Sequence, residues 1–193
     1  MRLFIGIYPN QEFLAYFRDV TRELDKQKRN LRFISLEQLH LTLRFIGPNV
    51  SLGSKIEIAN ALLKQAGQYP KPVINLTGLR LGVPGQHDPR VVIADVEENQ
   101  ELDSLVNMMH RAIRQVGKKD TILWKTKVDH NYHISLARMK DSATRSTGRE
   151  VKDIIREIDI PIPPAFQATE AYLVQSELTR RGPVYKKLEQ IRF

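Results

Sequence analysis

The chain has 193 residues, of which 41% are hydrophobic and 27% are charged, with a formal net charge of +8 and no cysteine. This composition is typical of a soluble globular protein, and it excludes disulfides and thiolate metal sites. No apolar run approaches the ~20 residues that span a bilayer, so we expect a cytoplasmic protein with no membrane partner. The basic excess favours a polyanionic partner such as nucleic acid, or reflects solubility alone.

Hydrophobic periodicity predicts strands and helices in regular alternation. The predicted order is strand 2–8, helix 11–28, strands 31–34 and 40–46, helix 52–66, strands 72–82 and 91–96, helix 99–116, strand 132–137, helix 147–157, and strands 166–175 and 184–192. Turns are predicted at 84–89 and 180–183, and 117–131 is predicted to be irregular. Asn10 is a suitable N-cap for the first helix.

Two similar tetrads lie 93 positions apart, His-Leu-Thr-Leu at 40–43 and His-Ile-Ser-Leu at 133–136. Successive side chains of a strand point to opposite faces. His40 and Thr42 are therefore expected to share one face, with aliphatic residues on the other, and the same holds for His133 and Ser135. Two such strands facing one cleft would present an acid/base pair beside two hydroxyl groups that bind phosphate.

Each tetrad strand is followed by a predicted helix and a predicted hairpin, which indicates an internal duplication of topology. This order predicts an α+β fold with two pseudo-symmetric lobes, in which antiparallel sheets flank a central cleft and helices cover the outer faces. We expect residues 1–193 to form a single bilobal domain.

A histidine serves as general acid or general base because its unperturbed pKa lies near 6.5. Taken singly, His40 is also consistent with a packed core histidine, and Thr42 with simple strand propensity; the matching tetrads favour catalysis. No acidic residue lies at a metal-binding spacing from His40, His130 and His133, so no metal and no cofactor are expected. His87 and His110 are expected on the surface, as is His130.

These residues resemble the two-histidine phosphoesterase superfamily, whose mark is a pair of His-x-Thr/Ser-x motifs. Within it the chain is similar to the RNA 2′,3′-cyclic phosphodiesterases of the LigT type, also called 2′–5′ RNA ligases. The similarity covers the opening strand at 2–7, the segments 33–47 and 133–138, and the C-terminal signature at 172–188. Tyr132 replaces a frequent proline and Phe33 a frequent tryptophan.

The resemblance implies metal-independent hydrolysis of an RNA 2′,3′-cyclic phosphate to a 2′-phosphate. It also implies that RNA ends can be joined in the reverse direction through a 2′–5′ bond. It implies that His40 protonates the ribose 3′-oxygen and that His133 activates water. Thr42 and Ser135 would bind the non-bridging oxygens, and Arg138 would grip the phosphate. Strict alternation puts Arg138 on the face opposite His133, so this role requires a bend near Ala137.

The expected partner is RNA with cyclic phosphate ends, tRNA fragments among them, bound by a monomer. Two alternatives stay open: a small-molecule cyclic nucleotide phosphodiesterase of the same superfamily, and a non-catalytic module that binds RNA ends. Trp124 and Tyr132 are candidates for base stacking. Phe45 alternates onto the aliphatic face, which favours core packing. Arg44 alternates onto the face of His40, where it would assist or remain solvated.

Overall fold

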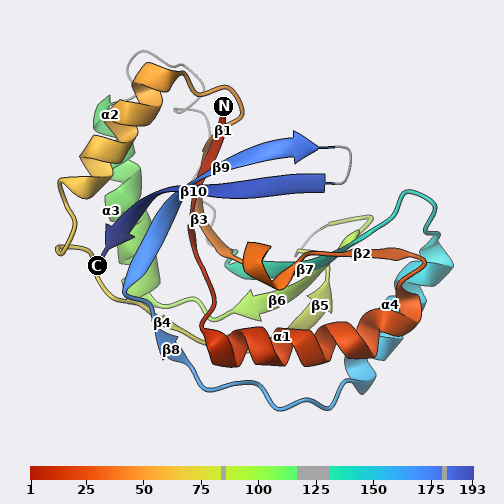
Figure 1. Cartoon of the computed structure of the whole chain (residues 1–193). Coiled ribbons are helices and arrows are strands. Elements are labelled where there is room, and N and C mark those ends of the chain that lie inside the picture. The colour runs from red at the N-terminus through yellow and green to blue at the C-terminus, as the bar shows by residue number, and fades with distance from the viewer. Residues whose placement is uncertain (84–85, 117–130, 180–181) are drawn as a thin grey trace.

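The strands that carry the two tetrads lie side by side at the centre of one curved antiparallel sheet (Figure 1). The structure is a computed structural model that describes residues 1–83, 86–116, 131–179 and 182–193. Trp124, His130 and parts of both predicted turns lie outside these residues.

The elements follow the predicted order closely. The strands are β1 (Arg2–Ile7), β2 (Leu31–Phe33), β3 (Leu41–Gly47), β4 (Val73–Ile74), β5 (Leu76–Leu81), β6 (Val91–Val96), β7 (His133–Met139), β8 (Phe166–Gln167), β9 (Glu170–Thr179) and β10 (Gly182–Arg192). The α-helices are α1 (Gln11–Leu24), α2 (Leu52–Leu63), α3 (Gln100–Val116) and α4 (Arg145–Glu157). The strand predicted over 72–82 is divided, and its first part, β4, pairs with β8 in a separate ribbon.

The main sheet runs in the order β10-β9-β1-β3-β7-β6-β5, and β2 pairs with the far end of β7. Its two halves meet only at β3 and β7, where Leu41 pairs with Ile134. Because this junction is so short, the two halves diverge from it as two lobes. The predicted α+β fold with two antiparallel lobes is confirmed, and the lobes are halves of one continuous sheet.

The two halves of the sequence exchange their hairpins. The β5–β6 hairpin follows β3 in the chain but pairs with β7, and the β9–β10 hairpin follows β7 but pairs with β1 beside β3. Each tetrad strand is therefore supported by a hairpin from the other half of the sequence. The predicted duplication is visible in this topology, although the repeated units are interleaved in space.

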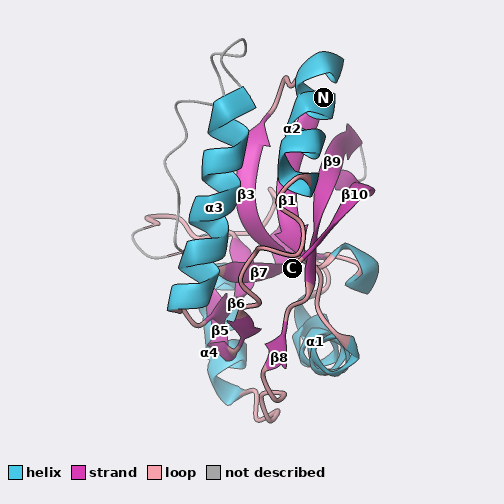
Figure 2. Ribbon diagram, turned by 90° about the vertical axis from the view of Figure 1, so that its left-hand side faces the viewer, coloured by secondary structure: helices cyan, strands magenta, loops and turns pink. Residues whose placement is uncertain are grey.

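Helices cover one face of each lobe and leave the other face open. Helices α2 and α3 pack together over β3 and β10, while α1 and α4 pack over the lobe of β5, β6 and β7 (Figures 1 and 2). The predicted cap of α1 is confirmed, because the backbone N–H of Phe13 donates to the Asn10 side chain at 3.0 Å. Among the described residues, no helix has the length and apolar character needed to cross a membrane.

Both tetrad strands contain a β-bulge three residues after the histidine. On β3, Thr42 pairs with Gly6 and Arg44 with Ile5, so Leu43 is the extra residue. A bulge places two residues opposite one and shifts the alternation by one position. As a consequence Leu43 and Arg44 are both buried, and the side chains beyond them change face.

The bulge on β7 has the same form. Ser135 pairs with Ile93 and Ala137 with Val92, which leaves Leu136 as the extra residue. Leu136 and Ala137 are consecutive buried residues. The next residue, Arg138, is thereby returned to the open face of the sheet.

Candidate active site

A cleft of about 200 Å³ lies on the open face where β3 and β7 meet, and it contains every site residue predicted from the sequence. Its walls come from both lobes. The lining residues are Arg2, Phe4, Ile34, His40, Thr42, Phe45, His133, Ser135, Arg138, Ser176 and Tyr185.

The pairing of Leu41 with Ile134 fixes how the two tetrads face each other. In an antiparallel pair the residue numbers run in opposite directions on either side of that point. His40 is therefore opposite Ser135, and Thr42 is opposite His133. Each histidine lies across from the hydroxyl residue of the other tetrad, so the two histidines and the two hydroxyl residues have an approximate two-fold arrangement.

Both histidine rings are held through Nδ1. Nδ1 of His40 lies 2.8 Å from the carbonyl oxygen of Gln38, and Nδ1 of His133 lies 2.7 Å from that of Asn131. A carbonyl oxygen only accepts hydrogen bonds, so Nδ1 of each ring carries a hydrogen. Nε2 is then the nitrogen that gains or loses a proton in each ring.

His40 is packed against aromatic rings. The Phe4 ring is stacked on the imidazole with 4.6 Å between centroids, and the Tyr185 ring meets it edge-on at 4.8 Å. Tyr8 lies further out at 6.0 Å. This enclosure restricts the orientation of the His40 ring and covers part of its surface.

Burial lowers the pKa of His40 below its ordinary value, because the charged imidazolium is desolvated. The hydrogen bond to Gln38 acts in the opposite direction, and the charges of His133 and Arg138 lower the pKa further. Those charges act on His40 because all three side chains share the cleft. His40 therefore releases its proton more readily than an exposed histidine would.

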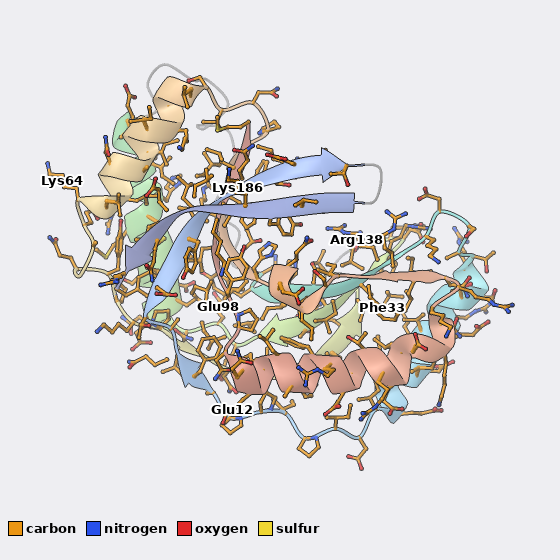
Figure 3. The ribbon with its side chains drawn as sticks, viewed as in Figure 1. Glu12, Phe33, Lys64, Glu98, Arg138 and Lys186 are labelled. Carbon is orange, nitrogen blue, oxygen red and sulfur yellow. The ribbon has the colours of Figure 1, made fainter. Side chains whose placement is uncertain are left out.

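The bend that Arg138 requires is the bulge at Leu136. Arg138 is exposed and lines the cleft. Burial raises the pKa of Tyr185, and the nearby charge of Arg138 opposes that shift, as it adds to the lowering of the His40 pKa by burial. Figure 3 shows Arg138 beside β2. Strict alternation does not hold for Arg138 because the bulge adds one position between it and His133.

The equivalent bulge on β3 overturns two further expectations. Phe45 lines the cleft, and the Arg2 guanidinium lies 4.5 Å from the centroid of its ring. Arg44 is 6% exposed. Burial lowers the pKa of His110 on α3, and the nearby charge of Arg44 lowers it further, so Arg44 belongs to the face that the helices cover. Phe45 and Arg44 have thus exchanged the faces that strict alternation assigned to them.

The expectation that Tyr132 is available for base stacking is also wrong. Tyr132 is 4% exposed, and its hydroxyl donates to Oδ1 of Asp103 at 2.7 Å. Its place is the interface between β7 and α3, so it is unavailable for base stacking. His87 is exposed as predicted, and His110 is half-buried on α3.

Three aromatic residues around His40 were missed: Phe4, Tyr8 and Tyr185. The alternation of the first strand carries a signal for the first two, since Leu3, Ile5 and Ile7 supply the buried face. Tyr185 gives no such signal, because its position depends on how β10 is placed far along the chain. Among the described residues, no group of three or more histidine or acidic side chains has the arrangement of a metal site.

No protein-family model matches this chain. Three curated relatives are each named RNA 2′,3′-cyclic phosphodiesterase. The protein from Aeropyrum pernix is 30% identical over 84% of this chain and 86% of its own length. The protein from Archaeoglobus fulgidus is 27% identical over 97% and 98%, and that from Thermotoga maritima is 26% identical over 100% and 96%.

Two solved structures share the fold along their whole length. TT0787 of Thermus thermophilus has a TM-score of 0.74 and 24% identity, covering 100% of this chain and 97% of its own. Escherichia coli LigT without ligand has a TM-score of 0.66 and 22% identity, covering 99% and 96%.

Proposed function

This chain belongs to the family of RNA 2′,3′-cyclic phosphodiesterases, and we propose that it opens the cyclic phosphate at an RNA end by acid–base catalysis between His40 and His133. The observation that carries this proposal is the cleft at the junction of β3 and β7. There the two histidines, each with Nδ1 engaged, lie across from the hydroxyl residues Ser135 and Thr42.

In the proposed reaction, Nε2 of His133 accepts a proton from a water molecule while the oxygen of that water attacks phosphorus. The bond between phosphorus and the 3′-oxygen breaks, and Nε2 of His40 donates a proton to that oxygen. The products are a 2′-phosphate and a free 3′-hydroxyl. Each proton transfer contributes a factor of roughly 10²–10⁴ to the rate.

The non-bridging oxygens are held by neutral and charged donors. The hydroxyls of Thr42 and Ser135 donate from the two tetrads, and the Arg138 guanidinium offers a planar pair of N–H groups that suits a phosphate. Such donors, fixed in place before the reaction, stabilise charge as it develops on the phosphoryl oxygens. The proposed mechanism therefore uses side chains alone and no metal.

The lowered pKa of His40 is compatible with its role as the acid. A more acidic imidazolium transfers its proton more easily to the leaving oxygen, while the negative charge of a bound phosphate favours the protonated ring. The same cleft would join two RNA ends when an RNA 5′-hydroxyl takes the place of water at His133. Attack by that hydroxyl and departure of the 3′-oxygen would give a 2′–5′ bond.

A second hollow next to the cleft supports a nucleotide substrate. It has a volume of about 260 Å³ and shares Ile34, Arg138 and Tyr185 with the catalytic cleft. Phe33 and Pro183 add apolar surface of the kind on which bases and riboses pack. E. coli LigT, which has the same fold at 20% identity, was crystallised with 3′-AMP.

The proposal is tested with an RNA that carries a 2′,3′-cyclic phosphate, incubated with the protein in EDTA. The expected product is a 2′-phosphate formed at the same rate with and without the chelator. A 3′-phosphate product would reverse the leaving-group assignment of His40, and activity that depends on added metal would contradict the mechanism. Because His87 is exposed and is not among the residues that line the cleft, His87→Ala is the matched control.

A further inference from the structure

We infer that a basic hollow formed by Arg32, Arg90 and Lys140 binds the phosphodiester that joins the last two nucleotides of the RNA. This inference rests on the proposed function, because it assigns a second subsite to the same substrate. It adds a specific preference, which is that the substrate is a strand and that recognition extends one phosphate beyond the terminal nucleoside.

Three hollows follow one another along the open face. The catalytic cleft adjoins the hollow lined by Phe33 and Pro183, called the apolar hollow from here on. The two share Ile34, Arg138 and Tyr185. The apolar hollow adjoins the basic hollow, of about 280 Å³, through Arg32 and Arg138. An RNA strand alternates phosphate, nucleoside and phosphate, and the hollows present cationic, apolar and cationic linings in the same order.

Arg32 and Arg138 form the boundary between the hollows. They are direct partners in the pairing of β2 with β7, and both are exposed. Like charges directly opposite each other on neighbouring strands disfavour the folded sheet. Within the described part of the chain, no carboxylate lies within ion-pair distance of either guanidinium. A bound phosphate would neutralise this repulsion.

The other cations of the hollow are held in place by the backbone around them. Arg90 donates to the carbonyl oxygen of Lys140 at 2.6 Å, and its guanidinium lies 3.7 Å from Asp88. The Lys140 ammonium donates to the carbonyl oxygen of Lys28 at 3.1 Å. Asp141 is the acidic side chain in the lining, against four cations when Arg138 is counted. The hollow is therefore positively charged and formed in advance of binding.

The apolar hollow defines which direction the strand takes. A fourth hollow is lined by Tyr8, Tyr172 and Lys187, and it shares no lining residue with the catalytic cleft. The Lys187 ammonium there lies 3.7 Å from the Tyr8 ring centroid and 4.3 Å from that of Tyr172, so one face of each ring is already occupied. The nucleoside is consequently expected on the side of Phe33, which leads to Arg32.

The test compares three substrates: a 2′,3′-cyclic mononucleotide, a dinucleotide with the same cyclic end, and that dinucleotide with a neutral methylphosphonate linkage. We expect kcat/KM for the charged dinucleotide to exceed that for the mononucleotide by about tenfold, the effect of one hydrogen bond to a charged group. The methylphosphonate should lose most of this gain. Equal rates for the charged and neutral dinucleotides would overturn the inference.

The variant Arg32→Gln should reduce the ratio of dinucleotide to mononucleotide kcat/KM toward one. Lys64→Gln removes the same charge on the far side of the molecule, next to α2 (Figure 3), and should leave the ratio unchanged. An undiminished ratio in Arg32→Gln would also overturn the inference. Absence of turnover on all three substrates by the wild-type protein would instead refute the proposed function.

Discussion

His40 and His133 hold their rings in the same way, each with Nδ1 bonded to the carbonyl oxygen two residues before it in the chain. Their surroundings differ, because aromatic rings pack on His40 and its Nδ1 hydrogen bond is partly buried, whereas the Nδ1 hydrogen bond of His133 is exposed. Equal orientation with unequal burial distinguishes the two histidines chemically. The approximate two-fold arrangement of the tetrads therefore does not make their roles equivalent.

We predict a bell-shaped dependence of kcat/KM on pH whose acid limb lies below pH 6.5. The active protein carries one proton on the histidine pair, and burial lowers the pKa of His40. The first proton is therefore lost below the ordinary histidine pKa of about 6.5. Activity should rise as pH increases through that lowered pKa, because the pair then carries a single proton and this state includes the reactive form with the proton on His40. Activity should fall when the pair loses its second proton.

The variant Tyr185→Ala should move the acid limb toward pH 6.5, because loss of the ring admits water to His40 and reduces the desolvation. Tyr16→Phe, in the buried face of α1, is a control that should not move it. An acid limb that stays in place in Tyr185→Ala would mean that the aromatic enclosure does not set this pKa.

A substrate with sulfur in place of the 3′-oxygen should separate the two roles. A thiolate leaves without protonation, so His40→Ala should lose much less activity on the sulfur substrate than on the oxygen substrate. His133→Ala should lose about the same factor on both, since water must still be activated. If the sulfur substrate restored the activity of His133→Ala and not that of His40→Ala, His133 would be the acid and His40 the base.

Sequence pattern alone was sufficient for the fold class and for the pairing of each histidine with a hydroxyl residue. The fold class follows from the order of the predicted elements. The pairing follows from strand alternation over the first three residues of each tetrad, which come before either bulge. The pattern failed immediately afterwards, at Arg44, Phe45 and Arg138, because the bulges at Leu43 and Leu136 each add one residue. Aliphatic residues occupy both bulges, so no residue type marked them.

Other parts of the site depend on long-range packing. Phe4 and Tyr185 reach His40 from strands at opposite ends of the chain, and their encounter follows from the β9–β10 hairpin crossing to β1. Tyr132 reads as an exposed aromatic beside His133, yet its hydroxyl pairs with Asp103 on α3. Such contacts are set by topology, which a local pattern does not contain.

Arg138 should bind the phosphate through two parallel N–H donors, and not through its charge alone. Arg138→Ala should lower kcat/KM by about 10²-fold, and Arg138→Lys should recover part of that loss because lysine keeps the charge without the planar pair of donors. Steady-state kinetics on a cyclic mononucleotide measure this. Arg156→Ala, on the exposed face of α4, is the control for loss of an arginine. Full activity in Arg138→Ala would contradict a role of Arg138 in binding the phosphate.

Asn10 should stabilise α1 through its cap. Asn10→Ala removes the acceptor for the Phe13 N–H and should lower the free energy of unfolding by about 1 kcal/mol. Urea denaturation followed by circular dichroism measures the change. Asn107→Ala, at an exposed position within α3, places alanine where it is favoured and should cause no loss. Equal effects at both positions would argue against the cap.

The most direct test of the account is turnover of an RNA 2′,3′-cyclic phosphate end by His40→Ala, His133→Ala and the double variant. We predict that each single change lowers kcat by roughly 10²–10⁴-fold. The double variant should lose little more than the worse single one, because the two histidines act as a unit. Wild-type turnover in either single variant, with the fold intact and His87→Ala as the control, would contradict the central claim.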